Sequence, residues 1–409
     1  MKNWATNITF HDAQTLHPKS IEQLREIVSS FPKVRARGSA HCFNTIADSR
    51  ETVVVLDAMP KEMSINTDTK IATVGAGLNY AQISEFLYKN GWAVHNLASL
   101  PHISIAGAVA TGTHGSGIKN GPLHTAIRSV TLLQADGNLR TLVRDVDPEF
   151  YGSIVSLGLA GIVISYEIDI EPSFSVYQTV YGDMPCDVFG DNILEILSSA
   201  YNVSFFTRWG RTQVGDVWLK SKTEPPRALF DTKPRTEKAH PILGEDADSC
   251  TDQLGIPGPW HLRLPHFRID ANPSAGNELQ SEFFVDSQDA QSGFRAIQAI
   301  SEQFASKLLV TEIRSMAADK HWLSPSYDRE TVAFHFTWKN DYEIPYLVSL
   351  IEDALEPFNF RAHFGKVFNV DHAHFKKVFP EFPKFKDLVT KLDPDGKFQN
   401  EFTHQILGF

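Results

Sequence analysis

The sequence has few cysteines and no excess of positive charge. Its three cysteines, Cys42, Cys186 and Cys250, are too few and too widely spaced for a disulfide framework or a zinc site, so we expect no metal centre. Lys and Arg number 38 against 49 Asp and Glu, which gives a formal net charge of -11. This balance argues against nucleic acid or an anionic membrane as the main partner, and the cysteine usage suits a reducing cytoplasm.

Long hydrophobic runs and the common nucleotide-binding fingerprints are also missing. The most apolar stretch, residues 153–168, is interrupted by Ser and Gly and is too short to cross a bilayer. The opening residues, MKNWATNITF, lack the apolar core and cleavage site of a signal peptide. Neither G-x-G-x-x-G after a strand nor G-x-x-x-x-G-K-[ST] occurs, which argues against a Rossmann domain and a P-loop. We expect a cytoplasmic monomer without a membrane or nucleic-acid partner.

What the chain does contain predicts an α+β protein of two domains. With 409 residues, 42% of them hydrophobic, it exceeds the size of one ordinary hydrophobic core. Apolar periodicity and capping residues predict helices over 20–31 and 79–91, and strands over 33–38, 51–59, 70–77, 161–172 and both arms of a hairpin at 126–144. Beyond about residue 175 the composition shifts to aromatic, strand-like runs with a loop-rich insert at 221–250, which we expect to be mobile.

Polar residues alternate with apolar ones in two of these later runs. Glu312 and Arg314 in TEIRS, like His335 and Thr337 in FHFTW, project to one face of a strand while their neighbours project to the other. Gln280, in ELQSEFF, could extend the same polar face. The pattern fits a polar pocket on a packed sheet, but the solvent face of an antiparallel sheet alternates in the same way.

Two loops of small residues precede that region. RGSAH, at 37–41, and GAVATGTHGSG, at 107–117, have few bulky side chains and would let backbone amides approach a large polar ligand closely. His41 directly follows the turn in the first loop. A lone histidine at a strand end is more often an ordinary surface or core residue, so only its context can assign it a role.

With these motifs the sequence resembles the vanillyl-alcohol-oxidase type of flavoprotein, and within it the sugar-alcohol (alditol, xylitol) oxidases. RARGSAHCFN resembles the flavin-attachment loop and ASLPHISIAGAVATGTHGSG the pyrophosphate-binding loop. ELQSEFFV, TEIRSM, FHFTW and HFGKVF resemble the substrate-site strands, and DPDGKFQNEF the segment that returns to the flavin domain. The resemblance implies a PCMH-type FAD-binding domain at 1–175, an antiparallel-sheet substrate-binding (cap) domain at 176–370 and a returning segment at 371–409.

The resemblance also implies FAD bound covalently, through a bond from an imidazole nitrogen of His41 to a methyl group of the flavin ring. That bond requires a neutral imidazole, which a histidine pKa of about 6.5 makes readily available. The residues implied to bind the cofactor are Arg37, Gly38, Ser39, Ala40, His41, Asn44, Ala98, Ser99, His102, Ser104, Gly107, Ala110, Thr111, Gly112, His114, Gly115, Gly161 and Ile162. Serine is more usual after the histidine in this family, and we interpret Cys42 as a buried small residue.

The implied reaction is oxidation of a terminal primary hydroxyl of a polyol such as xylitol or sorbitol to the aldose, with O2 reduced to H2O2. Lys366, with His335 nearby, would assist loss of the hydroxyl proton, and Arg314 would orient the reacting oxygen and stabilise its negative charge. The residues implied to bind substrate hydroxyls are Ser99, Gln280, Glu312, Arg314, Thr337 and Lys366. An aldonolactone oxidase or dehydrogenase, or a non-catalytic carbohydrate-binding protein of the same fold, are the alternatives.

Overall fold

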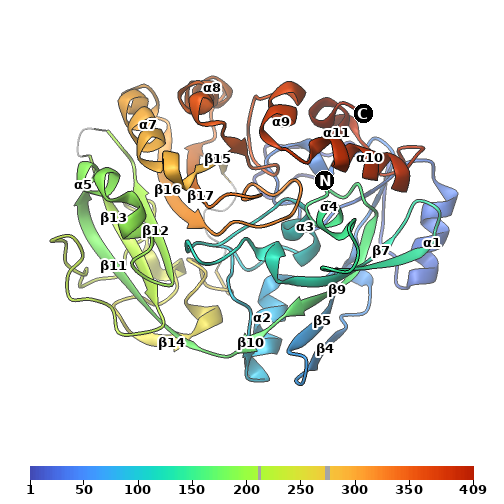
Figure 1. Cartoon of the computed structure of the whole chain (residues 1–409), viewed down its shortest axis with the longest axis horizontal. Coiled ribbons are helices and arrows are strands. Elements are labelled where there is room, and N and C mark those ends of the chain that lie inside the picture. Colours follow the sequence, from blue (N-terminus) through green and yellow to red (C-terminus); the bar gives the residue numbers. More distant parts are fainter. Residues whose placement is uncertain (211–212, 272–276) are drawn as a thin grey trace.

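The computed structural model describes residues 1–210, 213–271 and 277–409, and it is built around two antiparallel sheets (Figure 1). A five-stranded sheet uses strands between residues 63 and 169, and an eight-stranded sheet uses strands between 175 and 362. The predicted α+β class is confirmed. The change of sheet falls beside the expected boundary at 175, since β10 ends at Pro172 and β11 begins at Ser175.

The amino-terminal part combines the five-stranded sheet with a small parallel one. The first has the order β4-β5-β9-β7-β8, with strands Met63–Asn66, Ile71–Gly75, Ile162–Asp169, Ile127–Leu133 and Leu139–Val143. The second has the parallel order β1-β3-β2, with strands Gln14–Leu16, Thr52–Val54 and Val34–Ala36. The predicted hairpin is present as β7 and β8. The short strands β1 and β4 were not predicted.

Both predicted amino-terminal helices are present, with their capping residues. Ser20 accepts a hydrogen bond from Gln23 at the start of α1 (Ile21–Ser30), whose Leu24 and Val28 are buried. Asn79 and Gln82 form a capping box at the start of α2 (Tyr80–Lys89). α1 leads directly to β2, and β2 leads to the loop that contains His41.

The eight-stranded sheet has an apolar face and a polar face. Its order is β14-β11-β13-β12-β16-β17-β15-β18, with strands Pro257–Pro259, Ser175–Pro185, Val214–Ser221, Asn202–Thr207, Leu308–Met316, Thr331–Lys339, Glu278–Asp286 and Arg361–Ala362. Helices α7 (Ala290–Phe304) and α8 (Ile344–Leu355) lie beside it in Figure 1, and Phe304 packs edge-on against Phe336 and Trp338. The apolar side chains of the alternating runs are therefore buried under these helices.

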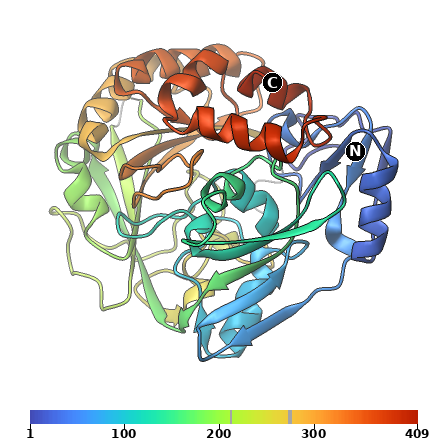
Figure 2. The same ribbon diagram turned by 45° about the vertical axis from the view of Figure 1, so that its right-hand side comes forward.

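The carboxyl-terminal segment lies against the amino-terminal part, and both chain ends are close together in Figures 1 and 2. Val34 donates to the Lys397 carbonyl, and Arg35 donates to the Phe398 carbonyl. The Asn400 side chain donates to the carbonyls of Thr45, Ile46 and Asp48. The end of the chain thus supports both sides of the His41 loop.

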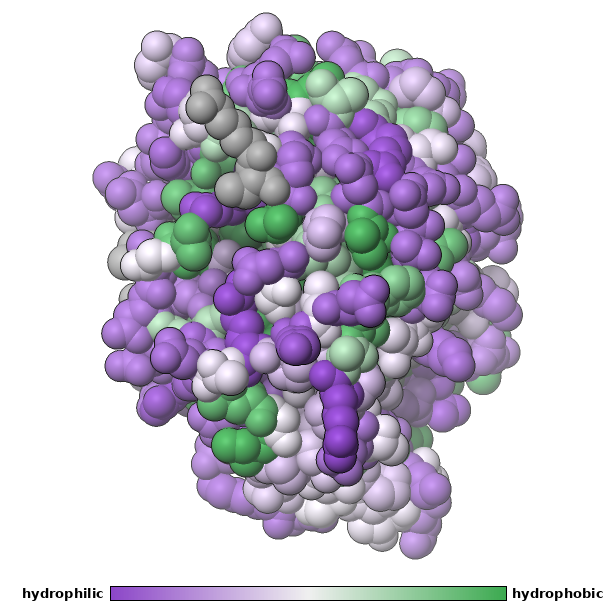
Figure 3. All heavy atoms as spheres, turned by 90° about the vertical axis from the view of Figure 1, so that its left-hand side faces the viewer, coloured by the Kyte–Doolittle hydropathy of each residue, from purple (hydrophilic) through white to green (hydrophobic). Residues whose placement is uncertain are grey.

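The remaining helices are short, and one face of the molecule is largely hydrophilic (Figure 3). The other α-helices are α3 (Ile105–Ala110), α4 (Phe150–Ile154), α5 (Cys186–Asp191), α6 (Ile193–Leu197), α9 (His372–Val378), α10 (Phe382–Leu392) and α11 (Glu401–Leu407), and β6 (Trp92–Ala93) pairs with β10 (Glu171–Pro172). Within the described ranges, no helix has the length and apolar character needed to cross a membrane. The face in Figure 3 is largely hydrophilic, with hydrophobic residues in small separate groups.

Candidate active site

The two small-residue loops lie against each other. Ser39 and Ser104 join them with reciprocal hydrogen bonds, 3.2 Å from the Ser39 amide to the Ser104 hydroxyl and 3.1 Å from the Ser104 amide to the Ser39 hydroxyl. A Cβ on Gly38 would lie 2.1 Å from the Ser104 Oγ and 3.7 Å from the Gly107 Cα, which lie just before and at the start of the second loop. Only glycine at position 38 permits so close an approach of the two loops.

His41 projects from the first loop and is held on two sides. One ring nitrogen, Nδ1, lies 3.0 Å from the Ser39 carbonyl, and the ring stacks on Trp4 with the centroids 5.3 Å apart. Ala40, just before it, has the left-handed backbone angle φ = 56°. Burial lowers the pKa of His41 to about 4. The imidazole is therefore neutral near pH 7, and the nitrogen that does not face Ser39 keeps a free lone pair.

A single cavity of about 650 Å³ connects the two loops with the polar face of the large sheet. All the residues predicted to bind substrate line it, as do most of those predicted to bind the cofactor, including His41. Asn44, Gly112 and Gly115 do not line it. Asn44 donates 2.8 Å hydrogen bonds to the carbonyls of Phe364 and Lys366, so it positions the backbone at Lys366.

The polar face of the sheet is buried and not a solvent face. In the register of the strands, Gln280 lies opposite Thr337, and His335 lies opposite Glu312, so the predicted polar residues share one surface. Glu312, Arg314, His335 and Thr337 are each less than 8% exposed. Because buried polar groups are costly unless they are paired, such a surface indicates a site and not incidental alternation.

Glu282 is the central carboxylate of this surface, and it was not predicted. Its side chain is 1% exposed, and it lies 2.8 Å from Arg314 Nη2, 2.9 Å from Lys366 Nζ and 3.2 Å from His114 Nε2. Burial alone would raise the pKa of Glu282, but Lys366, His114 and Arg314 hold it well below its usual range. Glu282 follows Gln280 by two residues on β15, so the alternation that singled out Gln280 also pointed to it.

The pKa values of the two cations beside Glu282, Lys366 and Arg314, are shifted in opposite directions. Burial lowers the pKa of Lys366, although Glu282 partly offsets this. Burial also acts to lower the pKa of Arg314, but Glu312 and Glu282 raise it above its usual value. Arg314 is therefore a fixed positive charge, whereas Lys366 is the cation that can release a proton more readily than an ordinary lysine.

The hydrogen bonds at Gln280 fix the protonation pattern of His335. Gln280 Nε2 lies 2.6 Å from Glu278 Oε1 and must donate to it, because a carboxylate only accepts. Gln280 Oε1 therefore faces His335 Nε2, at 3.0 Å, and that nitrogen carries the proton. Burial and Lys366 hold the pKa of His335 well below its usual value. His335 is thus neutral, and its Nδ1 has no partner among the described residues.

Two further features of the cavity wall also escaped prediction. Trp4 lies under His41, but nothing in MKNWATNITF marks it as part of a site. His266 lies 2.8 Å from Glu312, but it follows an irregular loop without periodicity.

Cys42 was expected to be simply buried, and this is wrong in part: it is half-buried and lies on the cavity wall. All three cysteines are free.

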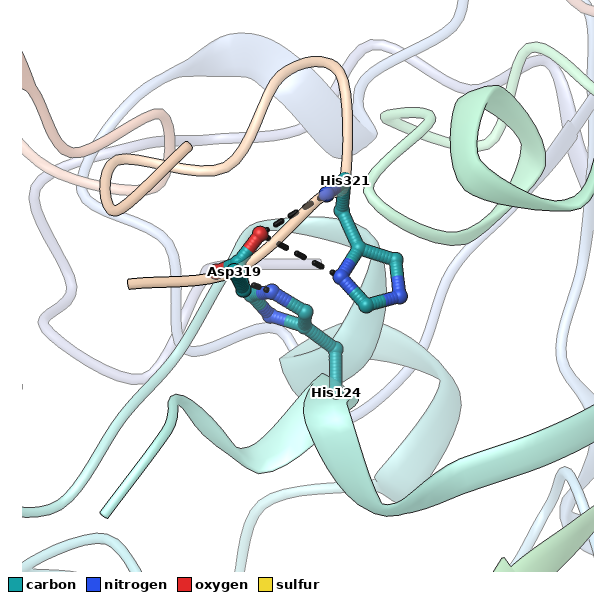
Figure 4. A group of neighbouring side chains, drawn as sticks. All are labelled: His124, Asp319 and His321. Atoms are coloured by element: carbon teal, nitrogen blue, oxygen red, sulfur yellow. Dashed lines mark hydrogen bonds and ion pairs between the residues drawn. The ribbon is translucent and has the colours of Figure 1, made fainter. Parts of the chain in front are cut away.

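A group with the composition of a metal site lies between the amino-terminal part and the connection from β16 to β17 (Figure 4). Asp319 sits between His124 and His321, 3.1 Å from the first imidazole and 3.3 Å from the second. The outer nitrogens, His124 Nδ1 and His321 Nε2, are buried and have no hydrogen-bond partner among the described residues. A metal ion would displace the two inner protons onto these outer nitrogens and leave two buried donors unsatisfied. The group is better explained as a hydrogen-bonded contact between distant segments.

Comparison with known families agrees with this geometry. Residues 13–142 match the FAD binding domain family, and residues 277–406 match the D-arabinono-1,4-lactone oxidase family. The chain belongs to the FAD-linked oxidases of the vanillyl-alcohol-oxidase (PCMH) type and is a flavin-dependent oxidoreductase.

Within this family the chain is similar to an alditol oxidase from a Streptomyces species, with 40% identity over 99% of this chain and 98% of the relative. It is also similar to L-gulonolactone oxidase from Bos taurus, with 23% identity over 99% and 97%. A cholesterol oxidase variant from Brevibacterium sterolicum shares the fold, with a TM-score of 0.81 at 14% identity over 100% of this chain and 96% of that one. At that identity the likeness shows the fold alone.

The residues around the cavity fit a bound FAD. The close contact of the loops at Gly38 and Gly107 exposes backbone along the cavity wall, as a dinucleotide requires. Gly161, with φ = 136°, would bring a Cβ within 2.8 Å of the Leu133 carbonyl, so no side chain can intrude there. The histidine, the small-residue loops and the polar sheet face all line the same space.

Proposed function

We propose that the protein oxidises a terminal primary hydroxyl of a polyol such as xylitol or sorbitol to the aldose, and that O2 takes up the electrons to give H2O2. The observation that carries this proposal is the buried polar face, which shares one cavity with His41 and the small-residue loops. A polyol presents a hydroxyl on every carbon, and a pocket with buried hydrogen-bonding groups rejects molecules that leave those groups unpaired. The similarity to an alditol oxidase supports the same substrate class.

The bound flavin would supply the hydride acceptor, and the side chains would control the proton. Lys366, with its pKa lowered by burial, and His335, with a free Nδ1 lone pair, are the two groups able to take the hydroxyl proton. Arg314 stays charged and would stabilise negative charge as it develops on the reacting oxygen. Ser99, Gln280, Glu312 and Thr337 would bind the other hydroxyls.

The attachment of FAD to His41 is part of the proposal. It is supported by the neutral imidazole, its free lone pair and its position on the cavity wall. Flavin should stay with the polypeptide through acid precipitation and denaturing electrophoresis, and His41→Ala should release it. Complete loss of flavin from the denatured wild-type protein would disprove the covalent bond.

Substrate comparison under anaerobic conditions tests the reaction. We expect xylitol or sorbitol to reduce the flavin faster than galactono-lactone, with peroxide formed in equal amounts to product when air is admitted. An aldonolactone oxidase is the second candidate, because residues 277–406, which include the substrate-site strands, match a lactone oxidase family. A clear preference for lactones would show that the protein is a lactone oxidase and not a polyol oxidase. Product formed without peroxide would show that O2 is not the electron acceptor.

The remaining expectations belong to the same proposal. We place the functional domains at 1–175 and 176–370, with 371–409 returning to the first, and we propose a cytoplasmic monomer. The three free cysteines support a reducing compartment. Sedimentation of the holoenzyme would reveal its oligomeric state, and a stable dimer would contradict the proposed monomer.

A further inference from the structure

Lys220 is a buried cation that the proposed mechanism does not use. It lies on β13 with an exposed fraction of 0%. Its ammonium group donates to the Leu264 carbonyl and lies 3.1 Å from His266 Nδ1. No carboxylate of the described residues is within ion-pair distance of it, and burial lowers its pKa to about 7. A lysine held in this way is costly for the fold, so its retention needs a reason.

His266 connects this lysine to the cavity. Its ring lies edge-on to Phe206 and Trp218, with both pairs of centroids 5.3 Å apart, so its orientation is fixed. Nδ1 faces Lys220, and Nε2 lies 2.8 Å from Glu312 Oε1. Burial and Lys220 lower the pKa of His266 to about 4, which leaves one donor and one acceptor on the ring. Because Glu312 can only accept, Nε2 must carry the proton, and Nδ1 accepts from Lys220.

The strand register explains how Lys220 reaches this position. Trp218 lies opposite Ser204 on β12, and Phe206, two residues further along that strand, lies opposite Glu312 on β16. Lys220 follows Trp218 by two residues on β13, so it is on the same face of the sheet as Trp218, Phe206 and Glu312. Both contacts of Glu312 within the described part of the chain, with His266 and with Arg314 Nε at 3.6 Å, fall on Oε1. Oε2 is the oxygen that a ligand in the cavity can use.

We propose that Lys220 and His266 are positioning residues that hold Glu312 as an ionised acceptor of polyol hydroxyls. This inference rests on the proposed function. His266 fixes one carboxylate oxygen, Lys220 fixes the protonation pattern of His266, and the second oxygen of Glu312 then receives hydroxyl protons from the substrate. The chain of contacts makes this end of the pocket selective for molecules that carry hydrogen-bond donors there, and it disfavours ethers and ketones.

A comparison of variants by anaerobic flavin reduction tests the proposal. Lys220→Met should raise the half-saturating xylitol concentration about tenfold, as expected for loss of support to a charged hydrogen bond, while the limiting rate changes less than about threefold. Lys339→Met, an exposed lysine on β17, serves as the control and should match the wild type. The decisive comparison is Lys220→Met in a Glu312→Gln background, where it should have no further effect. Additive losses in the double variant would show that Lys220 acts elsewhere.

A second pair of variants keeps the test valid if Lys220→Met does not fold. His266→Gln keeps a donor for Glu312 and an acceptor for Lys220, whereas His266→Phe keeps the ring shape and loses both. We expect the glutamine variant to bind xylitol within about threefold of the wild type, and the phenylalanine variant about tenfold more weakly. Equal affinities would overturn the positioning role. If xylitol and sorbitol fail to reduce the wild-type flavin at all, the proposed function itself is wrong.

Discussion

Replacement of Glu282 by glutamine would show how far the site depends on its central carboxylate. The change keeps the size of the side chain and removes the negative charge that faces Arg314 at 2.8 Å and Lys366 at 2.9 Å. Arg314 is buried and the side chain of Lys366 is 14% exposed, while Glu282 itself is 1% exposed. Loss of one partner of a buried ion pair typically costs about 3–5 kcal/mol. We therefore expect Glu282→Gln to lower the free energy of unfolding by about 4 kcal/mol at pH 7.

Urea unfolding followed by tryptophan fluorescence measures this loss, with Glu356→Gln as the matched control. Glu356 also pairs with a lysine, at 2.7 Å, but the pair is half-exposed, so its removal should not change the unfolding midpoint measurably. A second readout is the pH dependence of flavin reduction. Without Glu282, which raises the pKa of Lys366, the limb of the profile assigned to that lysine should move to lower pH. An unfolding midpoint equal to the wild type would refute the reasoning.

Three further results follow from the structure. Gly38→Ala should fold but bind little flavin, measured as the flavin-to-protein absorbance ratio, because its Cβ would meet the Ser104 hydroxyl at 2.1 Å; a full complement of flavin would contradict this. Lys366→Met should keep its flavin but reduce it about a hundredfold more slowly in single turnovers. A wild-type rate would mean that His335 or solvent, and not Lys366, accepts the hydroxyl proton. The contribution of His266 to stability should fall as the pH drops from 6.5 towards 4, because the folded protein keeps this imidazole, with a pKa of about 4, neutral while the unfolded chain protonates it. The loss from this one group is on the order of 3 kcal/mol, and an unfolding midpoint with the same pH dependence in His266→Phe as in the wild type would refute it.

The local elements of the fold could be predicted from the sequence, because their signals are local. Ser20 and Asn79 mark the starts of α1 and α2, and Asp136 with Gly137 marks the hairpin turn. The alternation in TEIRS and FHFTW correctly assigned the side chains to two faces of a sheet. Alternation could not show which face is buried, since that depends on what packs against it. The family resemblance, and not the pattern, favoured a pocket.

The parts that were missed depend on contacts between distant segments. Glu282 becomes the central carboxylate only because β15 pairs with β17 and Lys366 returns from beyond β18. Lys220 reaches Glu312 through a histidine on an irregular loop 46 residues away from each of them. Neither strand pairing nor the path of such a loop is encoded in a short window of sequence, so these residues could be found only in the folded chain.

The return of the carboxyl-terminal segment determines when a newly synthesised chain can mature. The His41 loop is made early, but the backbone groups that support it come from residues 364–366 and 397–400. These residues follow the loop by 320 positions or more. The His41 loop therefore lacks these supports until the later part of the chain has been synthesised, and we expect stable flavin binding only after that point. A chain released early, before residue 364, would carry the histidine and both small-residue loops and still be unable to complete the holoenzyme.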